Sequence, residues 1–581
     1  MERLERELGV SEPLAQVLVR RGLGEPARAR TFLAADEEHP PTAFAGIEQA
    51  IEPILRHVDS GERITIHGDY DVDGVCSTAV LVRSLRRIGG NVDWYLPDRA
   101  TDGYGLNPRT VQRLAQRGTR LLVTVDCAIT AVDEVQDAKA LGMEVVVTDH
   151  HAPRADGVLP QAPIVHPAIC DYPCRELCAT AVAYKLAQLL ESTFASRDRA
   201  DCAAPRDARA LEEDLDLVAL ATIADLVPLV GENRTLVRRG LRALAGTAKP
   251  GLRALMAVAR VAPGKLNERS VGFALAPRLN AAGRMHRADA GLELILTEDP
   301  ARAAKVAQEL DRVNYERRQM DTRIRYEAEA QLAALDPTHP HSAYVLASEN
   351  WHAGVIGIVA SRLVERHRRP VVMIALDGDT GKGSGRSIDA FDLLGGLTAC
   401  AGHLRGFGGH RAAAGLEIER GRVEEFAEAF RAHAEQVLSP ADMIPVERVD
   451  AVVGCEELGM ALAEELQTLA PFGRGNPGVT LLAADVMFRD VRPMGEGKHA
   501  RFTVQSGGAR ARGVAFGMGG HLPVGEGEAA EATFTLEVNE WNGVTEPRLV
   551  LRHARLAELP PQQPMRDPDP SAGDEELVLF A

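Results

Sequence analysis

The segment RITIHGDYDVDG, residues 63–74, decides how this chain folds around its functional centre. Its first half is a short run rich in β-branched residues, which favours a β-strand, and a helix is predicted to begin near Val75. Between strand and helix stand His67, Asp69, Asp71 and Asp73. In open parallel sheets ligands bind just beyond the carboxyl ends of the strands, so the segment predicts an α/β fold with a polar site at this point.

Two further strand-like runs end in side chains of the same kind. LLVTVD ends in Asp126, and MEVVVTDHH ends in Asp149, His150 and His151. Asp225 is a further candidate, because it stands inside the apolar run LDLVALATIADLVPL, where a buried charge without a partner is costly. Since parallel strands present their carboxyl ends at one edge of the sheet, we expect these side chains to meet at a metal site.

Each element also has an ordinary structural interpretation. DYDVDG matches the opening of an EF-hand calcium loop, but that loop needs Glu at its twelfth position, where this chain has Val80. It also needs a preceding helix, where this chain has a strand-like run. A single strand-end Asp is usually a helix N-cap, and an adjacent His pair is most often ordinary structure. The conjunction of acids and imidazoles after three successive strands favours the metal site.

The residue types at this site indicate which metal and which chemistry to expect. A site rich in carboxylates, with one or two imidazoles and no thiolate, suits manganese or magnesium better than structural zinc. The number of acids favours two divalent ions about 3.5–4 Å apart, bridged by a carboxylate. Such a pair activates water and stabilises the charge of an in-line attack on phosphorus. The sequence therefore predicts a metal-dependent phosphodiesterase.

Length and composition bound the class of protein. A chain of 581 residues is expected to form several domains, since single cores stop growing at roughly 250–300 residues. No apolar run suits a membrane helix, and the first residues lack the hydrophobic region of a signal peptide. Eight cysteines are too sparse for a disulfide scaffold, so we expect reduced thiols in a cytoplasmic protein. The net charge of −17 argues against a uniformly basic nucleic-acid coat and permits a local basic channel.

Composition shifts along the chain predict its domain organisation. The fold class is α/β: a parallel-sheet catalytic domain, a long connecting helix, a second α/β domain and a C-terminal β-barrel resembling an OB-fold. The predicted segments are an N-terminal helical segment at 1–44, the catalytic domain at 45–291, the connecting helix at 292–336, the second α/β domain at 337–440, the barrel at 441–560 and a disordered acidic tail at 561–581.

The chain resembles the DHH phosphoesterase family in four motifs, HGDYDVDG, VDCAIT, TDHH and ATIADLVPL, and in the flanking APRLNAAGRM. The second α/β domain resembles the DHH-associated domain in WHAGVIGIVASRLVERHRRP, GKGSGRS and GGHRAAAG. The β-rich end, with APFGRGNPGV and NEWNGVTEPRLVL, is similar to the OB-fold of the family's bacterial exonucleases. The resemblance implies a 5′-to-3′ exonuclease that hydrolyses single-stranded DNA to 5′-mononucleotides and acts in DNA recombination and repair.

The resemblance also implies roles for single residues at the metal site. The implied ligands of two manganese or magnesium ions are His67, Asp71, Asp73, Asp126, His150 and Asp225. Asp126 matches the bridging carboxylate, Asp71 belongs with one ion, and the remaining acids and His150 belong with the other. Whether His67 ligates or only supports is left open. Asp69 and Asp149 are expected to orient ligands, and His151 either holds an imidazole tautomer or faces the scissile phosphate as part of the catalytic set.

A second set of residues is implied to contact DNA. Arg99, Ser384 and Arg386 match residues that grip a terminal 5′ phosphate. The other candidates are Arg278, Asn280, Arg284, His352, His410, Phe502, Phe516 and Trp541. The three in PRLNAAGRM either contact the DNA backbone or brace the site, and the aromatic ones would stack on bases in the barrel. GKGSGRS can also be a flexible turn, and the Gly/Ala spacing of GGHRAAAG can reflect close helix packing.

Two other functions and several partners remain on the list of hypotheses. A DHH enzyme for short oligonucleotides or cyclic dinucleotides usually lacks the OB-like region, and a non-catalytic DNA-binding scaffold would not need intact ligands. The expected partners are single-stranded DNA and, from the resemblance, a single-strand-binding protein and a helicase, with no membrane. ELVLF near the C-terminus is loosely similar to peptides that dock on sliding clamps. Cys170, Cys174 and Cys178 suggest a cysteine cluster but lack metal-binding spacings.

Overall fold

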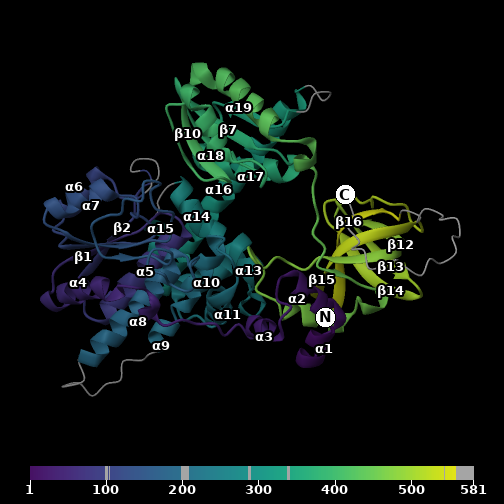
Figure 1. The fold of residues 1–581 in the computed structure, drawn as a ribbon, viewed down its shortest axis with the longest axis horizontal. Coiled ribbons are helices and arrows are strands. Elements are labelled where there is room, and N and C mark those ends of the chain that lie inside the picture. Colours follow the sequence, from purple (N-terminus) through teal and green to yellow (C-terminus); the bar gives the residue numbers. More distant parts are fainter. Residues whose placement is uncertain are drawn as a thin grey trace, which may run out of the picture. The chain divides into compact units, whose positions relative to one another are not determined.

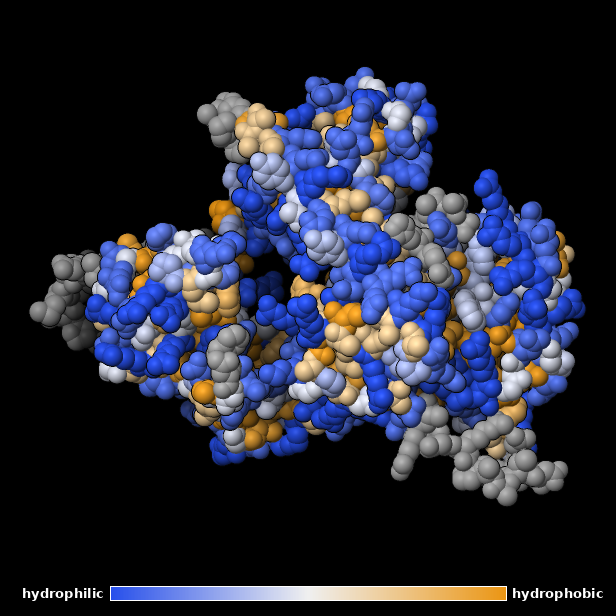
Figure 2. All heavy atoms as spheres, turned by 180° about the vertical axis from the view of Figure 1, so that it is seen from behind, coloured by the Kyte–Doolittle hydropathy of each residue, from blue (hydrophilic) through white to orange (hydrophobic). Residues whose placement is uncertain are grey.

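The structure is a computed structural model that describes residues 1–98, 103, 105–197, 209–285, 289–335, 341–541 and 543–557 (Figure 1). The chain divides into two compact units, unit 1 with Met1–Glu38, Pro228–Thr235 and Val446–Ala581, and unit 2 with His39–Val227 and Leu236–Pro445. The face seen in Figure 2 is predominantly hydrophilic, with hydrophobic residues in scattered groups. None of the described helices is both long and apolar enough to cross a membrane. The predicted tail at 561–581, with its clamp-like peptide, lies outside the described residues.

The first sheet of unit 2 is entirely parallel, as the sequence predicted, with the strand order β2-β1-β3-β4-β5. Its strands are β1 (Ile64–His67), β2 (Val92–Tyr95), β3 (Leu121–Thr124), β4 (Glu144–Thr148) and β5 (Ile164–Val165). All residues of β1 and β3 are buried, because helices cover both faces of the sheet. The order changes direction between β1 and β3, so the crevice for a ligand is expected at the carboxyl ends of these two strands.

Helices flank this sheet and extend it into a helical lobe. They are α4 (Ile47–Ser60), α5 (Val72–Arg87), α6 (Pro108–Gln116), α7 (Val132–Ala140), α8 (Ala179–Arg197), α9 (Arg209–Glu212), α10 (Leu215–Ala224), α11 (Gly231–Ala245), α12 (Pro250–Ala259), α13 (Glu268–Ser270), α14 (Ala276–Met285) and α15 (Asp289–Leu296). α5 packs against α8 and α10. α10 is buried from Leu215 to Ile223 and carries Asp225 at its end, so it is a core element that reaches the site.

The connecting helix is α16 (Pro300–Ala333), a helix of 34 residues. The sequence analysis predicted this helix at 292–336, and the start is wrong, because residues up to Leu296 belong to α15. The physical reason is a helix start signal that the long polar run concealed. Asp299 is the N-cap, its carboxylate accepts a hydrogen bond from the amide of Ala301, and Pro300 occupies the first helical position.

The second sheet of unit 2 is mixed and has the order β6-β7-β8-β10-β9. Its elements are β6 (Tyr344–Ser348), β7 (Val371–Asp377), β8 (Thr380–Arg386), β9 (Gly406–Gly409), β10 (Ala413–Glu419), α17 (Ala353–His367), α18 (Leu393–Ala399) and α19 (Val423–Val437). The predicted second α/β domain is therefore present. GKGSGRS forms most of β8, paired on both sides, so its interpretation as a flexible turn is wrong.

Unit 1 is built around a closed β-barrel, as the sequence predicted. Its strands are β11 (Ala451–Val452), β12 (Leu481–Met494), β13 (His499–Ser506), β14 (Ala509–Ala515), β15 (Ala529–Trp541) and β16 (Val544–Leu556). The barrel closes because β12 pairs with both β13 and β15. The helices α1 (Glu2–Leu8), α2 (Glu12–Arg20), α3 (Pro26–Ala34) and α20 (Met460–Gln467) share its hydrophobic core. The N-terminal helices, predicted as a separate segment at 1–44, thus belong with the barrel.

Candidate metal centre

The loop that follows β1 packs so tightly on the first turn of α5 that glycine is required at Gly68 and Gly74. A Cβ on Gly68 would lie 2.1 Å from Thr78 Oγ1, and a Cβ on Gly74 would lie 2.5 Å from the backbone nitrogen of Asp69. Real Cβ atoms do not approach other atoms this closely, so a side chain at either position would push the loop apart. The compact loop brings the aspartates of DYDVDG to the carboxyl end of β1.

Asp71 and Asp73 are oriented by the amino ends of two helices. Asp71 is the N-cap of α5, and its Oδ1 accepts hydrogen bonds from the amides of Asp73 at 2.9 Å and Gly74 at 3.1 Å. The Asp73 carboxylate accepts the amides of Ala179 at 2.7 Å and Thr180 at 2.8 Å, and the Thr180 hydroxyl at 2.6 Å. These hydrogen bonds hold both carboxylates in one orientation, although burial and the neighbouring charge of Asp73 raise the pKa of Asp71.

Asp126 follows β3 in a strained backbone conformation. Its φ is 61°, in the left-handed region that residues other than glycine seldom adopt, and it is 2% exposed. The preceding residue is held to β1, since the amide of Val125 donates to the carbonyl of His67 at 2.8 Å. Such strain costs on the order of 1–3 kcal/mol and persists where surrounding structure holds it, most often at functional sites.

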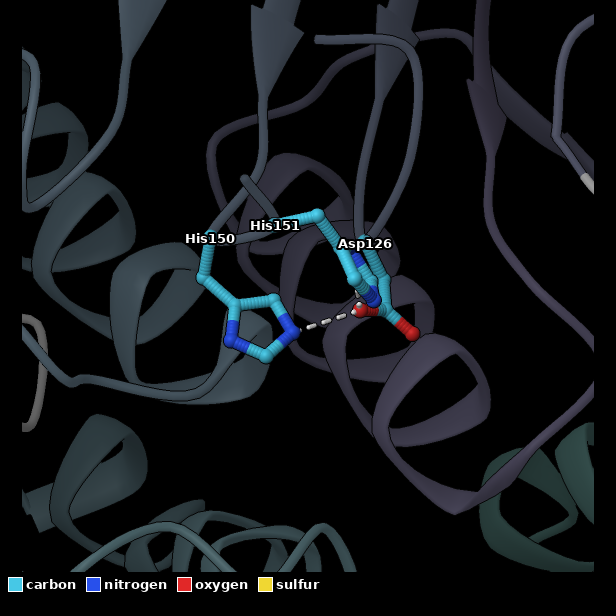
Figure 3. Close-up of side chains that lie close together, drawn as sticks. All are labelled: Asp126, His150 and His151. Carbon is cyan, nitrogen blue, oxygen red and sulfur yellow. Dashed lines mark ion pairs between the residues drawn. The ribbon is translucent and has the colours of Figure 1, made fainter. Parts of the chain in front are cut away.

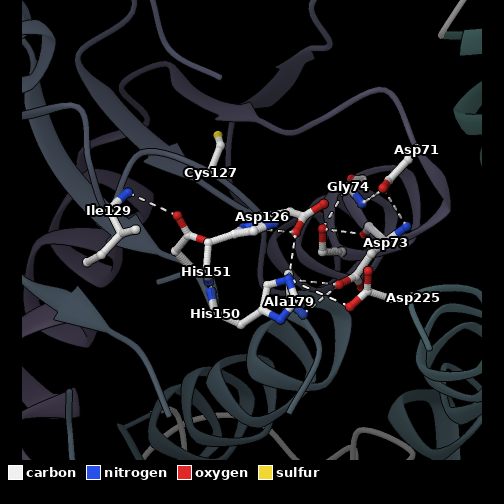
Figure 4. A network of polar contacts seen from close by, with 12 residues as sticks. Asp71, Asp73, Gly74, Asp126, Cys127, Ile129, His150, His151, Ala179 and Asp225 are labelled. Atoms are coloured by element: carbon white, nitrogen blue, oxygen red, sulfur yellow. Dashed lines mark hydrogen bonds and ion pairs between the residues drawn. The ribbon is translucent and has the colours of Figure 1, made fainter. Parts of the chain in front are cut away.

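His150 lies at the point where four elements meet (Figures 3 and 4). Its Nε2 is 3.2 Å from Asp126 Oδ1, 3.7 Å from Asp73 Oδ2 and 3.8 Å from Asp225 Oδ2. These carboxylates come from the end of β3, the first turn of α5 and the end of α10. Burial lowers the pKa of His150, which keeps its imidazole neutral, the form that binds metal ions.

Three groups of side chains within the described residues bring their ligand atoms within 4.8 Å of one another. They are Asp126 with His150 and His151, Asp73 with His150 and Asp225, and Asp69 with Asp71 and Asp126. Asp126 and His150 each belong to two groups, so the three groups form one continuous cluster. The structure thus brings together every acid and imidazole of the predicted centre except His67 and Asp149.

Asp149 and His151 form a pair beside this cluster. Asp149 Oδ1 accepts hydrogen bonds from the amides of both histidines and from His151 Nδ1 at 2.8 Å, and Oδ2 accepts the amide of Ile129 at 2.9 Å. Burial alone would raise the pKa of Asp149, but His151 and the amides outweigh burial and hold that pKa below its usual range. Burial opposes the charged form of His151, yet Asp149, Asp225 and Asp73 raise its pKa to about 9.

The electrostatics of the cluster fit a divalent cation. Burial, followed by the charges of Asp73, Asp71, Asp69 and Asp149, raises the pKa of Asp126 well above its usual range. A cation placed among these carboxylates would remove the repulsion, and a set of oxygen and imidazole donors suits manganese or magnesium. No cysteine belongs to any of the three groups among the described residues, so a cysteine metal site finds no support there.

His67 belongs to none of the three groups. It is fully buried, its ring stacks on Tyr95 with the centroids 5.5 Å apart, and its Nδ1 is 3.5 Å from Cys127 Sγ. Figure 4 shows Cys127 directed away from the carboxylates. Direct ligation of a metal ion by His67 stays a prediction.

A cavity of about 1240 Å³ in unit 2 opens onto the cluster. On the side of the parallel sheet and its helices, the cavity is lined by Asp71, His151 and Arg284. On the side of the mixed sheet, the lining includes His352, Ser384, Arg386 and His410. The cavity therefore brings five of the residues predicted to contact DNA, Arg284, His352, Ser384, Arg386 and His410, to the metal centre, and their roles stay predictions.

α17 packs against β8, the strand that carries Ser384 and Arg386, which are predicted to bind the 5′ phosphate. Ser384 Oγ accepts a hydrogen bond from Arg386 Nη1 at 3.1 Å. A Cβ on Gly357 would lie 2.8 Å from Ser384 Oγ and 3.0 Å from Arg386 Nη2, so the absence of a side chain there makes room for both. His352 is the N-cap of α17, and its Nδ1 accepts the amide of Gly354 at 3.1 Å.

Two of the candidates in PRLNAAGRM brace the structure. Asn280 Oδ1 accepts a hydrogen bond from the amide of Val72 at 3.0 Å, which joins α14 to the acidic loop, residues 68–73, that follows β1. Arg278 donates from Nε to Asp311 at 2.8 Å and from Nη1 to the carbonyl of Ala274, which joins α14 to α16. These contacts agree with the bracing alternative for these two residues. Arg284, by contrast, lines the cavity and donates to the carbonyl of Gly354 at 3.2 Å.

The prediction for Phe502 needs correction. Its ring is 3% exposed and packs edge to face on Phe488 with the centroids 5.2 Å apart, so it belongs to the barrel core and cannot stack on a base. Phe516 is 47% exposed, with the Arg548 guanidinium 5.9 Å from its ring centroid. Arg99 and the side chain of Trp541 lie outside the described residues.

Sequence reasoning missed the groups that hold Asp73. The amides of Ala179 and Thr180 are backbone donors, which any residue but proline supplies, so no residue type announced them. The Thr180 hydroxyl had only a weak signal, a polar residue in the apolar run that opens α8. Gly357 was missed because a single glycine in a helix has many possible causes and does not by itself indicate a site.

Comparisons with known proteins find family models that match the parallel-sheet domain, the mixed-sheet domain and the barrel. The model of the DHH family, N-terminal domain, matches residues 63–222, that of the DHHA1 domain matches 341–439, and that of the RecJ OB domain matches 449–553. The chain is 37% identical to the single-stranded-DNA-specific exonuclease RecJ of Bacillus subtilis over 569 residues, covering 96% of this chain and 69% of the relative. It is 36% identical to RecJ of Escherichia coli, covering 87% of this chain and 89% of the relative.

Solved structures agree with these relatives. The crystal structure of RecJ from Thermus thermophilus in complex with Mn²⁺ matches with a TM-score of 0.82 and 29% identity, covering 96% of this chain and 78% of that one. The same protein in complex with Mg²⁺ matches with a TM-score of 0.76. The agreement spans both units.

Proposed function

Because this chain belongs to the RecJ family of single-stranded-DNA-specific exonucleases, we propose that it hydrolyses single-stranded DNA from the 5′ end and releases 5′-mononucleotides. It is a hydrolase of phosphodiester bonds, and its cofactors are divalent manganese or magnesium ions. The observation that carries the proposal is the cluster of five aspartates and two histidines that follow β1, β3, β4 and α10, which opens into the cavity of about 1240 Å³.

Two ions fit the three groups of ligands. Asp73, His150 and Asp225 would hold one ion, Asp71 would hold the other, and Asp126 would bridge them, as it reaches both sides of the cluster. When bound, such a pair of ions activates water and stabilises the charge that develops on the phosphate. Ala179 and Thr180 hold Asp73 ready for this task, and Asn280 keeps the acidic loop in place.

The protein's own groups would orient the strand. His151 lines the cavity while its Nδ1 is engaged by Asp149, so it can donate a hydrogen bond to the scissile phosphate from Nε2. Ser384 and Arg386 line the same cavity and would hold the terminal 5′ phosphate, with Arg99 as a third donor. A phosphate held at a set distance from the metal centre selects the first phosphodiester bond, which explains the direction and the mononucleotide product.

The closed barrel argues against the smaller-substrate alternative, because a single-strand-binding module has no use with dinucleotides. The four aspartates that would ligate the ions, Asp71, Asp73, Asp126 and Asp225, argue against a non-catalytic scaffold. Action in recombination and repair and cooperation with a single-strand-binding protein and a helicase are parts of the proposal that come from the family alone. A cytoplasmic location rests on the sparse cysteines, and contact of the C-terminal tail with a sliding clamp rests on the ELVLF peptide.

The decisive experiment is a manganese-dependent degradation assay. Long single strands carrying a 5′ phosphate and a 3′ label are compared with the same strands labelled at the 5′ end, and with di- and trinucleotides. We expect immediate release of labelled mononucleotide from the 5′-labelled strand and late release from the other. Preference for the short substrates would contradict the proposal, and release from the 3′ end first would contradict its direction.

A further inference from the structure

A second polar cluster lies in the same helical lobe, away from the metal centre. Asp214, which precedes α10, is fully buried and accepts hydrogen bonds from Arg83 Nε at 2.8 Å and Arg87 Nη1 at 3.1 Å, both from the last turns of α5. Lys249, which precedes α12, lies 3.2 Å from Asp214 and donates to Asp216 at 2.9 Å and 3.0 Å. We call these five side chains the ion-pair network.

The position of the ion-pair network relates it to the metal centre. α5 begins at the acidic loop with Asp71 and ends near Arg87, whereas α10 begins beside Asp214 and ends at Asp225. The carboxyl end of α5 contacts the amino end of α10 through the network, and the opposite ends meet at His150. The two helices are therefore antiparallel, with the metal ligands at one end and the network at the other.

Apart from Asp214, which directly precedes it, α10 has few polar contacts that would fix its position along its own axis. It is buried from Leu215 to Ile223, and apart from Asp216 and Thr222 the buried side chains are apolar. Apolar contacts are not directional, so they resist sliding of a helix only through the fit of side-chain shapes. Asp216 is the polar residue at the amino end, and it binds Lys249 and, at 2.7 Å, the hydroxyl of Thr247.

We propose that Asp216, held by Lys249 and Thr247, is a positioning residue that sets how far α10 reaches into the metal centre and so places the Asp225 carboxylate beside Asp73 and His150. The ten residues of α10 form a rigid rod roughly 15 Å long, which transmits an axial shift from one end to the other. Functional groups must be held within about 0.5 Å, so even a fraction of the 1.5 Å rise per residue matters. The proposal rests on the proposed function in one respect, that Asp225 ligates an ion.

The test uses Asp216→Asn in the full-length protein. The variant removes one charge and keeps the shape of the side chain, and Lys249 retains its contact with Asp214, so no buried cation is left alone. Thr247→Val is a milder second variant: it removes the hydrogen bond to Asp216 and the longer one, at 3.3 Å, that the Thr247 hydroxyl accepts from the amide of Lys249, and it removes no charge.

Asp321→Asn is the matched control. Asp321 is 2% exposed and pairs with Arg362 Nη1 at 2.7 Å, which joins α16 to α17 in the same unit. It resembles Asp216 in burial and pairing and takes no part in the metal groups. A general loss of rigidity in unit 2 would therefore affect both variants alike.

The readout is Mn²⁺ binding by calorimetry without DNA, with the thermal midpoint of each variant measured alongside. We expect the wild type to bind two ions, and Asp216→Asn to bind one of them about tenfold more weakly while the other is nearly unchanged. Thr247→Val should show a smaller shift at the same ion. Unchanged binding in Asp216→Asn would overturn the proposal, as would equal weakening in Asp321→Asn or a wild type that binds no Mn²⁺. A wild type that binds both ions but leaves single strands intact would contradict the proposed function and leave this test valid.

Discussion

Two clusters of buried carboxylates lie at opposite ends of the helix pair formed by α5 and α10. In the ion-pair network, Asp214 and Asp216 contact Lys249, and Asp214 also accepts a hydrogen bond from Arg83. In the metal centre, burial and four neighbouring aspartates raise the pKa of Asp126 well above its usual range. The first cluster is balanced by cations of the chain itself, whereas in the second, within the described residues, the carboxylates outnumber the one cationic side chain, His151, so that a metal ion would relieve their repulsion. One cluster therefore holds the fold, and the other sacrifices stability to bind a metal.

The largest expected effect separates activity from stability at the metal centre. Asp126→Ala should lower kcat by about 10⁴-fold, equivalent to about 5 kcal/mol, because it removes the bridging carboxylate. Its thermal midpoint in chelator should stay equal or rise, because the substitution removes a repelled buried charge. Exonuclease assays and thermal unfolding check the two halves. Retained cleavage would refute the bridging role, and unfolding in chelator would show that Asp126 supports the fold.

The converse result is expected at the ion-pair network. Asp214→Ala should destabilise the protein by about 3 kcal/mol, since removing one partner of a buried pair leaves the other charges uncompensated. Denaturant unfolding monitored by circular dichroism measures this loss, and the wild type and Asp214→Ala are compared both in Mn²⁺ and in chelator. The same loss is expected in both buffers, and a loss that appears only with Mn²⁺ would break the distinction between the two clusters.

Metal addition sharpens the comparison further. A ligand that binds only the folded state stabilises it by about 2.7 kcal/mol at a free concentration of 100 times its dissociation constant. Mn²⁺ should therefore raise the thermal midpoint of the wild type relative to chelator, and it should raise that of Asp126→Ala much less. Equal shifts in the two proteins would indicate that the stabilising ions bind elsewhere.

The smallest effect concerns a residue that holds a ligand. Thr180→Val removes the hydroxyl that donates to Asp73 at 2.6 Å and keeps the backbone amide. We expect Mn²⁺ affinity to fall about tenfold, as is usual when a partner of a metal ligand is lost, with little change in stability. Titration of cleavage rate and of bound ion against Mn²⁺ checks this, with Thr110→Val, a buried threonine of α6, as the control.

Much of the site was predictable because its side chains follow strands directly. Asp71, Asp126 and His150 each stand within a few residues of a buried β-branched run, and the geometry of a parallel sheet then brings strand ends together. The barrel was predictable for a similar reason, since alternating strands with short turns form a local pattern. Phe502 was misjudged because alternation shows that neighbouring residues face opposite sides of a strand, and leaves open which side is the core.

The ion-pair network shows the opposite case. Arg83, Asp214 and Lys249 are separated by 131 residues and then by a further stretch of chain, and none of them stands in a motif. Their pairing depends on how α5, α10 and the start of α12 pack, which no local pattern records. The packing of α1–α3 was likewise not predictable: their apolar faces indicate that they pack against another element, and only the structure shows that this element is the barrel.

By itself, the sequence determined the kinds of chemistry and the order of the domains, because residue types at strand ends and the periodicity of apolar residues act over a few neighbouring positions. The tertiary structure decided which acids share one cation site, which are neutralised by the chain's own lysine and arginines, and which aromatic rings face solvent. These outcomes depend on distances between segments far apart in the chain, and a buried charge is stabilised only by the groups that folding places within a few ångströms of it.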